Sequence, residues 1–402
     1  MFQPLADRPL LHTTSDLGRV MAAARELEAA GRTVYHLERG EPDFDTPPHV
    51  VEALARAARD GATHYPDARG VRELREALVA KLARDNAIAA HVDDIVVTLG
   101  GTHALFCAFQ ALLAAGDELL VLSPHWMAVP KLVGFVDGAR MRTLPAYLEL
   151  MSGAWTDAQF ADALRAAIGP HTKGLYLNTP NNPTGAVLTR GQLEAIAGVA
   201  IERGLWVVSD EAYEHLLYDG AQHVSIASLP GMAERTVTAF TFSKSYAMTG
   251  WRAGYAVSPP SLRGAMGPIL SFYTTHGVFP SVQLACAAAV SGPQDAVEAM
   301  RRAYDERRRS MLDGLAGGAV TAPDPRGAFY VFANAGAARG GRELWTMIEE
   351  WLSWGVAVLP GTAFGPEYGD WVRLSLATRP DHVAAAAKLL RERAGAGTGA
   401  TR

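Results

Sequence analysis

The sequence has few cysteines, no long apolar run and no excess of positive charge. Its 402 residues include only Cys107 and Cys286, which excludes a disulfide framework and favours a reducing, cytoplasmic compartment. Neither cysteine has the spacing of a metal ligand, so we predict no metal site. No stretch approaches the ~18 consecutive apolar residues of a membrane span, and we expect no signal peptide. Lys and Arg number 37 against 42 Asp and Glu, and the net charge of −5 argues against nucleic acid as a partner.

What the sequence does contain is an alternation of short apolar runs and helical patterns. The runs cover residues 95–99, 118–122, 173–177, 205–209 and 237–242. Helical patterns lie between them, at 102–115, 157–168 and 190–203. Apolar strands that are joined by helices are covered on both faces, so this alternation predicts an α/β fold with a mostly parallel sheet between helices.

The two ends of the chain carry a different pattern. Helices are expected at 17–30, 49–59 and 71–85, with a short strand at 33–37. A helical stretch at 281–315 breaks at Gly292-Pro293, and we interpret its basic run from Arg301 to Arg309 as a solvated face. The order strand, helix, strand, strand, helix then fills residues 329–393. We expect a large domain over 46–290, a small α+β domain over 291–394 and a frayed tail over 395–402.

The stretch around Lys244 concentrates residues that could bind and react. Lys244 lies just past an apolar run, and the ends of strands in open parallel sheets are where ligands bind. A lysine held there near another cation has a lowered pKa and can serve as a Schiff-base amine, whereas an isolated lysine is a surface charge. The hydroxyls of Thr241 and Ser243, with the Arg252 guanidinium, are donors suited to a phosphate.

Three other predicted strand ends also carry polar groups. Asp210 follows the fourth run and either caps the next helix or pairs with a protonated ring nitrogen, with Tyr213 within reach of a ring oxygen. Asn182 lies in a Pro-rich stretch. Either this stretch is a plain turn, or its fixed backbone positions Asn182 to donate to an anionic ring oxygen. Gly101 and Thr102 open a helix whose free amides suit a phosphate, although the G-x-G-x-x-G dinucleotide motif is missing.

Taken together, these motifs resemble a known family. The chain resembles the class I pyridoxal-phosphate (PLP) aminotransferases of the aspartate-aminotransferase type, fold type I, over residues 15–392. The resemblance implies a homodimer with active sites shared at the subunit interface. The matching segments are Gly40–Pro47 (GEPDFDTP), Asn182–Gly185 (NPTG), Ser209–Tyr213 (SDEAY), Ser243-Lys244, Met248–Arg252 (MTGWR) and Arg373–Ser375 (RLS).

The resemblance implies roles for the cofactor-binding residues. Lys244 would hold PLP covalently and, once substrate releases it, act as the general base. Asp210 would bind the pyridine nitrogen, Asn182 and Tyr213 the ring hydroxyl, and Trp126 would stack on the ring. The remaining cofactor contacts would be Gly101, Thr102, His103, Thr241, Ser243 and Arg252 on the phosphate, and Tyr65 on the phosphate of the neighbouring subunit.

The resemblance also implies the substrate contacts. Arg373 would bind the α-carboxylate of the amino-acid or 2-oxo-acid substrate in a bidentate pair. Gly40 would let this carboxylate approach closely, with Asn182 beside it. Residues 1–45 would join the small domain, with residues 10–17 as a lid over the substrate.

The sequence departs from the family at positions that bear on specificity. Aspartate-type bacterial members often have a lysine where this chain has Thr102, which weakens a dicarboxylate assignment. Glu38-Arg39 stands before Gly40 where small or apolar residues are usual. His276 and Phe279 lie in the segment that commonly crosses to the partner's site. We hypothesise that Arg39 and His276 shape a pocket for a polar or specialised side chain, rather than being ordinary drift.

Three functions compete at this stage. The first is transfer of an amino group from an L-amino acid to a 2-oxo acid by a ping-pong mechanism. The second is another PLP reaction on the same scaffold: β-elimination, decarboxylation, cyclisation or oxidation of an amino acid. The third is a non-enzymatic sensor, which we disfavour because such regulators carry a DNA-binding extension and some fifteen residues precede the resemblance here.

Overall fold

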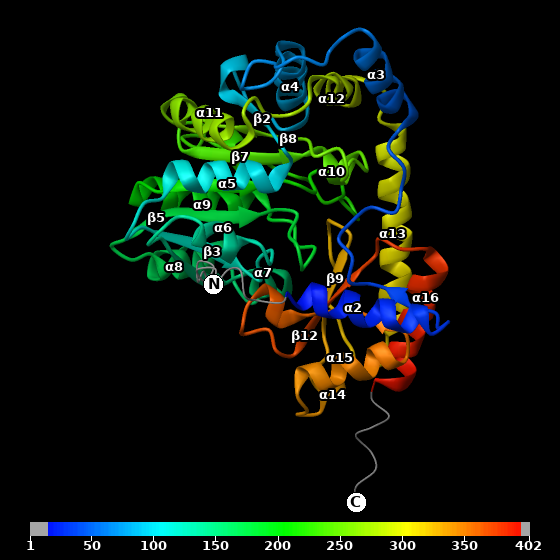
Figure 1. Cartoon of the computed structure of the whole chain (residues 1–402). Helices are drawn as coiled ribbons and strands as arrows, with labels where there is room; N and C mark the ends of the chain where they lie inside the picture. Colours follow the sequence, from blue (N-terminus) through cyan, green and yellow to red (C-terminus); the bar gives the residue numbers. More distant parts are fainter. Residues whose placement is uncertain (1–14, 395–402) are drawn as a thin grey trace, which may run out of the picture.

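A seven-stranded sheet forms the centre of the computed structural model, which describes residues 15–394 (Figure 1). β8 runs antiparallel to both of its neighbours, and all other pairs are parallel. The prediction of a mostly parallel sheet is therefore confirmed. In spatial order the strands are β2 (Ile95–Thr98), β8 (Gly254–Val257), β7 (Thr236–Thr241), β6 (Trp206–Asp210), β5 (Thr172–Asn178), β3 (Glu118–Ser123) and β4 (Arg140–Pro145).

Two of these strands, β4 and β8, were not predicted from the apolar pattern. β4 lies at the edge of the sheet, and only Leu144 among its residues is buried, so it lacks a continuous apolar run. β8 is buried but has only four residues, beginning at Gly254. The pattern detects strands that are covered on both faces over some length, and neither of these meets that condition.

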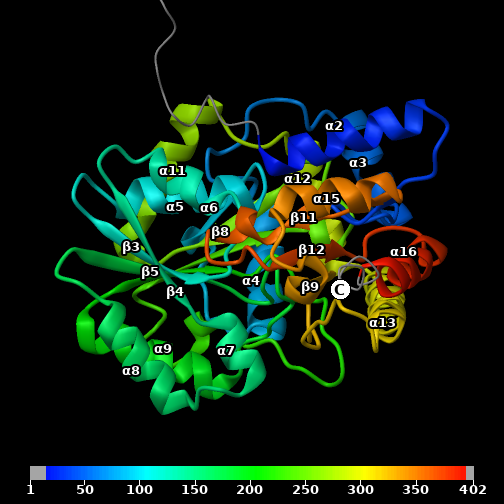
Figure 2. The ribbon, with the colours of Figure 1, turned by 90° about the horizontal axis from the view of Figure 1, so that it is seen from below.

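Helices cover both faces of the sheet (Figure 2). Successive residues of a strand face opposite sides, so Val96 joins one apolar core and Val97 another. In the described part of the chain, no helix combines the length and apolar character needed to cross a bilayer. One face carries α5 (Gly101–Leu112), α6 (Val129–Gly134) and α11 (Pro260–Thr274), and the other α3 (Pro48–Arg59), α4 (Arg72–Asp85), α7 (Tyr147–Ser152), α8 (Asp157–Ala167), α9 (Arg190–Arg203) and α12 (Pro280–Ser291).

A second, smaller set of strands brings the two ends of the chain together. β11 (Leu359–Pro360), β12 (Trp371–Ser375) and β9 (Tyr330–Asn334) form an antiparallel sheet, and β1 (Tyr35–His36) pairs in parallel with β10 (Val356–Ala357). Figure 1 shows the blue helix α2 beside the orange and red elements of the C-terminal part. The helices around these strands are α2 (Asp16–Ala29), α13 (Asp295–Leu315), α14 (Gly336–Arg339), α15 (Leu344–Ser353) and α16 (Pro380–Arg393).

The basic run of α13 corrects one prediction. Arg302 and Arg309 are exposed, but Arg307 and Arg308 are buried, so the run is only partly a solvated face. Arg307 donates to Asp43 Oδ1 at 2.7 Å, and Arg308 pairs with Asp219 Oδ2 at 2.6 Å and with Asp305 Oδ1 at 2.8 Å. Buried arginines are tolerated when carboxylates pair with them, and two of these partners, Asp43 and Asp219, lie far away in the sequence.

Candidate active site

A cavity of about 480 Å³ lies at the carboxyl ends of the central strands. Asn178, Asp210 and Thr241 are the last residues of β5, β6 and β7, and all three line it. Parallel strands present their carboxyl ends at one edge, which is where open α/β sheets bind ligands. Of the predicted site residues, those that line the cavity are Gly40, Gly101, Thr102, Trp126, Asn182, Asp210, Tyr213, Thr241, Ser243, Lys244, Arg252 and Arg373.

Lys244 sits in the short helix α10 (Phe242–Ser245), which starts directly after β7. Thr241 caps this helix by accepting a hydrogen bond from the amide of Ser243 at 3.2 Å. The Lys244 Nζ donates to the carbonyl of Gly40 at 2.6 Å. Burial, with help from the Arg373 and Arg252 cations, lowers the pKa of Lys244 to about 8. Near neutral pH a useful fraction of this amine is therefore unprotonated.

Asp210 is a buried carboxylate that lines the cavity at the end of β6. Its Oδ2 accepts from the Tyr176 hydroxyl at 2.9 Å, and its Oδ1 accepts from the Ala212 amide at 3.3 Å. Burial raises the pKa of Asp210 to about 6, against these two hydrogen bonds. Asn178 fixes the backbone here, because its Nδ2 donates to the Asp210 carbonyl while its Oδ1 accepts from the Asn182 amide. A cation placed beside Asp210 would keep it ionised.

One end of the cavity is built for an anion. Gly101 and Thr102 begin α5, so their amides have no partner within the helix. Thr241 Oγ1 donates to Ser243 Oγ at 3.0 Å, which places both hydroxyls at this end. Arg252 lies alongside them, close to the backbone of Gly100.

The close approach of Arg252 to the backbone of residue 100 explains why that residue is a glycine. A Cβ at Gly100 would lie 3.0 Å from the Arg252 Nη2, and the φ of +95° at Gly100 also favours glycine. The guanidinium is oriented by two carbonyls, donating to Thr249 at 2.7 Å and to Leu99 at 3.1 Å. The arginine and the helix amides thus share one small volume.

Arg373 projects into the cavity from β12 of the small sheet. It is buried, with Nη1 donating to Asn182 Oδ1 at 3.2 Å and Nη2 donating to the Glu38 carbonyl at 2.7 Å. Its Nε has no hydrogen-bond partner among the described residues. A buried donor without a partner is costly, and a carboxylate ligand would satisfy it. A Cβ at Gly40 would lie 2.9 Å from the Tyr330 hydroxyl, so glycine keeps this approach open.

Three predicted site residues lie outside the cavity of this chain. His103 Nδ1 accepts from the Leu99 amide at 3.2 Å, and burial lowers the pKa of His103, so it serves as a neutral backbone acceptor. Arg39 is exposed and contacts Glu38 at 3.4 Å. Tyr65 is 78% exposed and lies on the His276 ring, with 4.6 Å between centroids.

The residues predicted to set specificity lie outside the cavity, whereas one residue of the predicted lid lines it. Neither Arg39 nor His276 lines the cavity, so this chain's own geometry offers no contact between them and a ligand there. Leu17, the last residue of the predicted lid, does line it. Residues 10–14 of that lid, like the predicted frayed tail at 395–402, lie outside the described residues.

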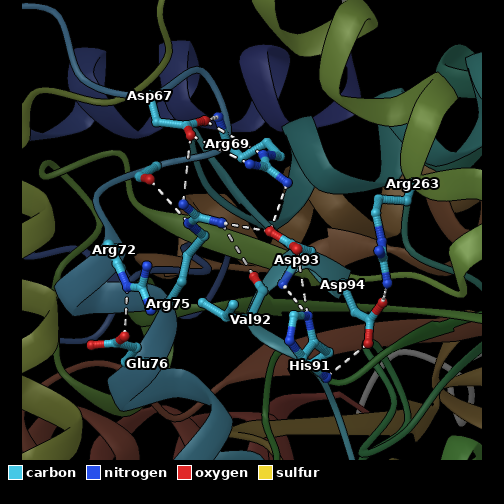
Figure 3. A network of polar contacts seen from close by, with 11 residues as sticks. Asp67, Arg69, Arg72, Arg75, Glu76, His91, Val92, Asp93, Asp94 and Arg263 are labelled. Carbon is cyan, nitrogen blue, oxygen red and sulfur yellow. Dashed lines mark hydrogen bonds and ion pairs between the residues drawn. The ribbon is translucent and has the colours of Figure 1, made fainter.

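The loop that follows Tyr65 is held by a network of charges (Figure 3). The buried Arg75 donates to the carbonyls of Gly70 at 3.0 Å and Val92 at 3.3 Å. Asp93, in η1 (Val92–Asp94), accepts from the Arg69 Nη1 at 2.8 Å, and Arg75 lies 3.5 Å from the same carboxylate. The network ties the loop to α4 and to η1, so Tyr65 projects from a fixed base.

Sequence reasoning missed several residues of the cavity. Tyr330 in β9 donates to or accepts from the Tyr213 hydroxyl at 3.0 Å, and its ring lies 4.4 Å from the Arg373 guanidinium carbon. A tyrosine within an apolar strand is indistinguishable from a core aromatic in a single sequence. The lining residues without a predicted role are Glu41, Leu105, Met127, Asn178, Ala212, Thr249, Gly250 and Tyr330, of which Glu41, Ala212, Thr249 and Gly250 fell within quoted motifs.

The turn that follows β6 is held by a buried ion pair between Glu214 of the turn and Lys81. Lys81 Nζ lies 2.5 Å and 2.6 Å from the two carboxylate oxygens of Glu214, and Asn86 donates to the same group at 2.8 Å. Glu211, Glu214 and His223 come close enough to hold a metal ion, but these carboxylates already accept from protein donors. Burial alone would raise the pKa of Glu214, whereas Lys81 and two nearby histidines lower it to about 2.

Replacing Lys81 by methionine should destabilise the fold. An uncompensated buried carboxylate costs about 3–5 kcal/mol, so we expect the free energy of unfolding to fall by that amount near pH 7. In the wild type the pair stabilises the protein above pH 4.5, the ordinary value for Glu, and this contribution is lost as pH falls toward 2. Urea denaturation at pH 7.5 and pH 5 should show the deficit of the variant shrinking in acid, because its unpaired Glu214 takes up a proton. The double variant K81M/E214Q should recover most of the stability, and equal stability of K81M and the wild type would contradict the role.

Known proteins match this chain over nearly its whole length. The sequence model of the family described as aminotransferase class I and II matches residues 32–390. The chain is 39% identical to an aspartate aminotransferase of Geobacillus stearothermophilus over 94% of this chain and 95% of that protein. It is 42% identical to an aspartate/prephenate aminotransferase of Thermus thermophilus, over 90% and 92% of the two chains.

Solved structures agree with the sequence relatives. An aspartate aminotransferase of Thermus thermophilus with maleate superposes with a TM-score of 0.87 at 39% identity, covering 96% of this chain and 98% of that one. An aspartate aminotransferase of Rhizobium meliloti gives a TM-score of 0.89 at 32% identity, with 98% and 99% covered. The chain therefore belongs to the class I and II aminotransferases, PLP-dependent enzymes of fold type I that move an amino group from an amino acid to a 2-oxo acid.

Proposed function

We propose that the cavity at the ends of β5, β6 and β7 binds PLP and catalyses the ping-pong transfer of an amino group between an L-amino acid and a 2-oxo acid. One observation carries this assignment. The amine of Lys244, with its lowered pKa, lines the same cavity as the buried carboxylate of Asp210 and the guanidinium of Arg373. A base, a partner for a ring cation and a carboxylate receptor are the groups that this reaction requires.

The residues present fit PLP. Among the described residues no cation pairs with the buried carboxylate of Asp210, and a protonated ring nitrogen would supply one. The amides that open α5, the two hydroxyls of Thr241 and Ser243, and Arg252 form a set of donors of the kind that holds a phosphate. The residues that would hold the remaining atoms are Asn182 and Tyr213 at the ring hydroxyl, Trp126 on the ring face and Lys244 at the aldehyde carbon.

The mechanism follows from what these side chains can do. When bound, PLP supplies an electron sink for the carbanion that forms as the Cα–H bond of the amino acid breaks. Lys244 Nζ takes that proton and later returns it, which requires a neutral amine and therefore a lowered pKa. Arg373 binds the α-carboxylate through its fork and so orients the Cα–H bond toward the base. Asp210 would stay ionised beside the ring nitrogen, and its negative charge would stabilise the proton on that nitrogen.

The assembly that we propose is a homodimer with shared active sites. Tyr65 is 78% exposed, and the α11 side chains Phe272 and Tyr273 are 83% and 60% exposed, with Phe279 nearby at 46%. Exposed aromatic clusters of this kind typically mark protein interfaces. In such a dimer Tyr65 would reach the phosphate in the partner's cavity.

We also propose the domain limits and the location. A large domain over residues 46–290 is supported by the seven-stranded sheet, and a small domain over 291–394 with the N-terminal segment is supported by the β1–β10 pair. A cytoplasmic location is supported by the two cysteines, which are free and buried, so that no disulfide contributes to the fold.

For the amino donor we propose an uncharged side chain, although the relatives are named for aspartate. Among the described residues that line the cavity, the cations are Lys244, Arg252 and Arg373, and each already has a role. The additional charge is negative, on Glu41, which would repel a second carboxylate. The remaining wall of the cavity includes the apolar side chains of Leu17, Leu105 and Met127 and the aromatic ring of Tyr330.

A panel of amino acids tests both parts of this proposal. The purified enzyme with PLP is incubated with each donor, with and without 2-oxoglutarate or pyruvate, and the keto product is measured. We expect more than one equivalent of keto product per site only when an acceptor is present, because without one the enzyme stops after the first half-reaction. We also expect kcat/KM to be about 10-fold higher for neutral donors than for aspartate, a difference of about 1.4 kcal/mol. Release of ammonia or carbon dioxide without an acceptor would contradict transamination, and a preference for aspartate would contradict the donor class.

A further inference from the structure

His36 is a histidine whose two ring nitrogens both face carboxylates. Nδ1 lies 2.8 Å from Glu38 Oε1, and Nε2 lies 2.9 Å from Glu28 Oε1 of α2. An ionised carboxylate only accepts, so both nitrogens must donate, and a ring with two N–H groups is the imidazolium. The remaining charged neighbour is Arg39, whose Nη2 lies 3.4 Å from Nε2. His36 is therefore a cation held between two acids.

Glu38 needs that cation. Its side chain is fully buried, and Oε2 has no hydrogen-bond partner among the described residues. An isolated buried carboxylate is strongly disfavoured, and among the described residues the other cation in contact with Glu38 is the half-exposed Arg39 at 3.4 Å. The shorter contact to His36, at 2.8 Å, thus holds the Glu38 carboxylate in place.

The main chain of Glu38 carries the substrate-binding groups. Its carbonyl accepts from the Arg373 Nη2 at 2.7 Å, and the Gly40 carbonyl two residues later accepts from the Lys244 Nζ at 2.6 Å. One residue earlier, the Leu37 carbonyl accepts from the Ser375 amide of β12 at 2.7 Å. Residues 37–40 are therefore the support against which Arg373 is oriented, and the Glu38 side chain anchors that support.

We propose that His36 and Glu38 are positioning residues, which hold the Glu38 carbonyl in place for Arg373 and so set the affinity for the substrate carboxylate. The proposal rests on the proposed role of Arg373 in binding that carboxylate. Neither side chain lines the cavity, so neither contacts the substrate. In His36→Gln the Glu38 carboxylate loses its counter-ion and moves or takes up a proton, and the carbonyl moves with it.

Binding of propanoate, a carboxylate without an amino group, tests this idea apart from turnover. Calorimetric titration of the enzyme with PLP should give a dissociation constant about 10-fold higher for His36→Gln, within the range for coupled neighbours. KM for donor and acceptor should rise similarly, with kcat changed less than about twofold. The double variant H36Q/E38Q removes the unpaired charge and should recover most of the affinity. His171→Gln, an exposed histidine in a loop, is the matched control.

The pH dependence gives a second readout. The hydrogen bond to Glu38, with that to Glu28, raises the pKa of His36. The pair is thus intact at low pH and is lost as pH rises through that pKa. The ratio of the two dissociation constants, variant over wild type, should fall toward one as pH rises, while the titration of Lys244 affects both proteins alike. An unchanged dissociation constant in H36Q, or a loss that the double variant fails to recover, would overturn the proposal. If Arg373→Ala still abolishes propanoate binding in that case, the proposed function itself stands.

Discussion

Replacement of Lys244 by alanine should lower kcat by roughly 10⁴-fold, the upper end of the effect of a general base. Lys244 is the amine among the described cavity residues, and burial with Arg373 lowers its pKa to about 8. Without it the Cα proton has no comparable base in place, because the other polar groups among the described lining residues are cations, amides, weakly basic hydroxyls and the carboxylates of Glu41 and Asp210, which accept hydrogen bonds from protein donors. The visible absorption of the bound cofactor should also change, since the covalent link is lost.

Single-turnover mixing of the enzyme with an amino acid, followed by visible absorption, measures both effects. Lys388→Ala, an exposed lysine on α16, is the matched control and should retain wild-type rates. Addition of a small primary amine to the alanine variant should restore part of the activity, because the missing function is a base. A variant that keeps more than a tenth of the wild-type rate would remove Lys244 from the mechanism.

Replacement of Arg373 by alanine should lower kcat/KM by roughly 30- to 4,000-fold, corresponding to the 2–5 kcal/mol lost when one partner of a buried charge pair is removed. Arg373 is buried, and its Nε has no hydrogen-bond partner in the described part of the chain, so it is available to a carboxylate. Arg373→Lys should recover only part of the loss, because an ammonium keeps the charge but not the fork that pairs with both oxygens.

The loss should fall on substrate rather than on cofactor. KM for the amino donor and the 2-oxo acid should both rise, while PLP content and absorption stay as in the wild type, because Arg252 and α5 lie at the other end of the cavity. Steady-state kinetics with PLP quantified after denaturation separates the two effects. If Arg373→Ala lost the cofactor and left KM unchanged, the assignment of the two ends of the cavity would be reversed.

Much of the central sheet and its catalytic edge could be predicted from the sequence. The five apolar runs became β2, β3, β5, β6 and β7, because a strand that is covered on both faces has only local apolar requirements. Asp210 and Lys244 could be placed for the same reason. Each follows one of these runs, and parallel strands deliver their ends to one edge. Arg373 came instead from the family resemblance, since β12 belongs to another sheet.

Polar residues whose partners lie far away in the sequence could not be assigned in this way. Arg307 and Arg308 looked like a solvated face, yet their partners include Asp43 and Asp219. Tyr330 looked like a core aromatic but meets Tyr213 at the cavity wall. In each case burial is decided by a contact between segments, and no local pattern reports it.

The low cysteine content, the lack of long apolar runs and the near-balanced charge said less about function than the arrangement of a few polar residues. By itself the sequence determined a chain with no disulfide framework, a mostly parallel sheet and a row of reactive side chains after its strands. Only the tertiary structure decided which of those side chains share one cavity and that His103 and Arg39 lie outside it. It also decided that the Glu38 carbonyl accepts from Arg373 while the Glu38 side chain contacts His36. The physical reason is that secondary structure follows local apolar periodicity, whereas the state of a buried charge depends on the counter-charge that folding brings to it.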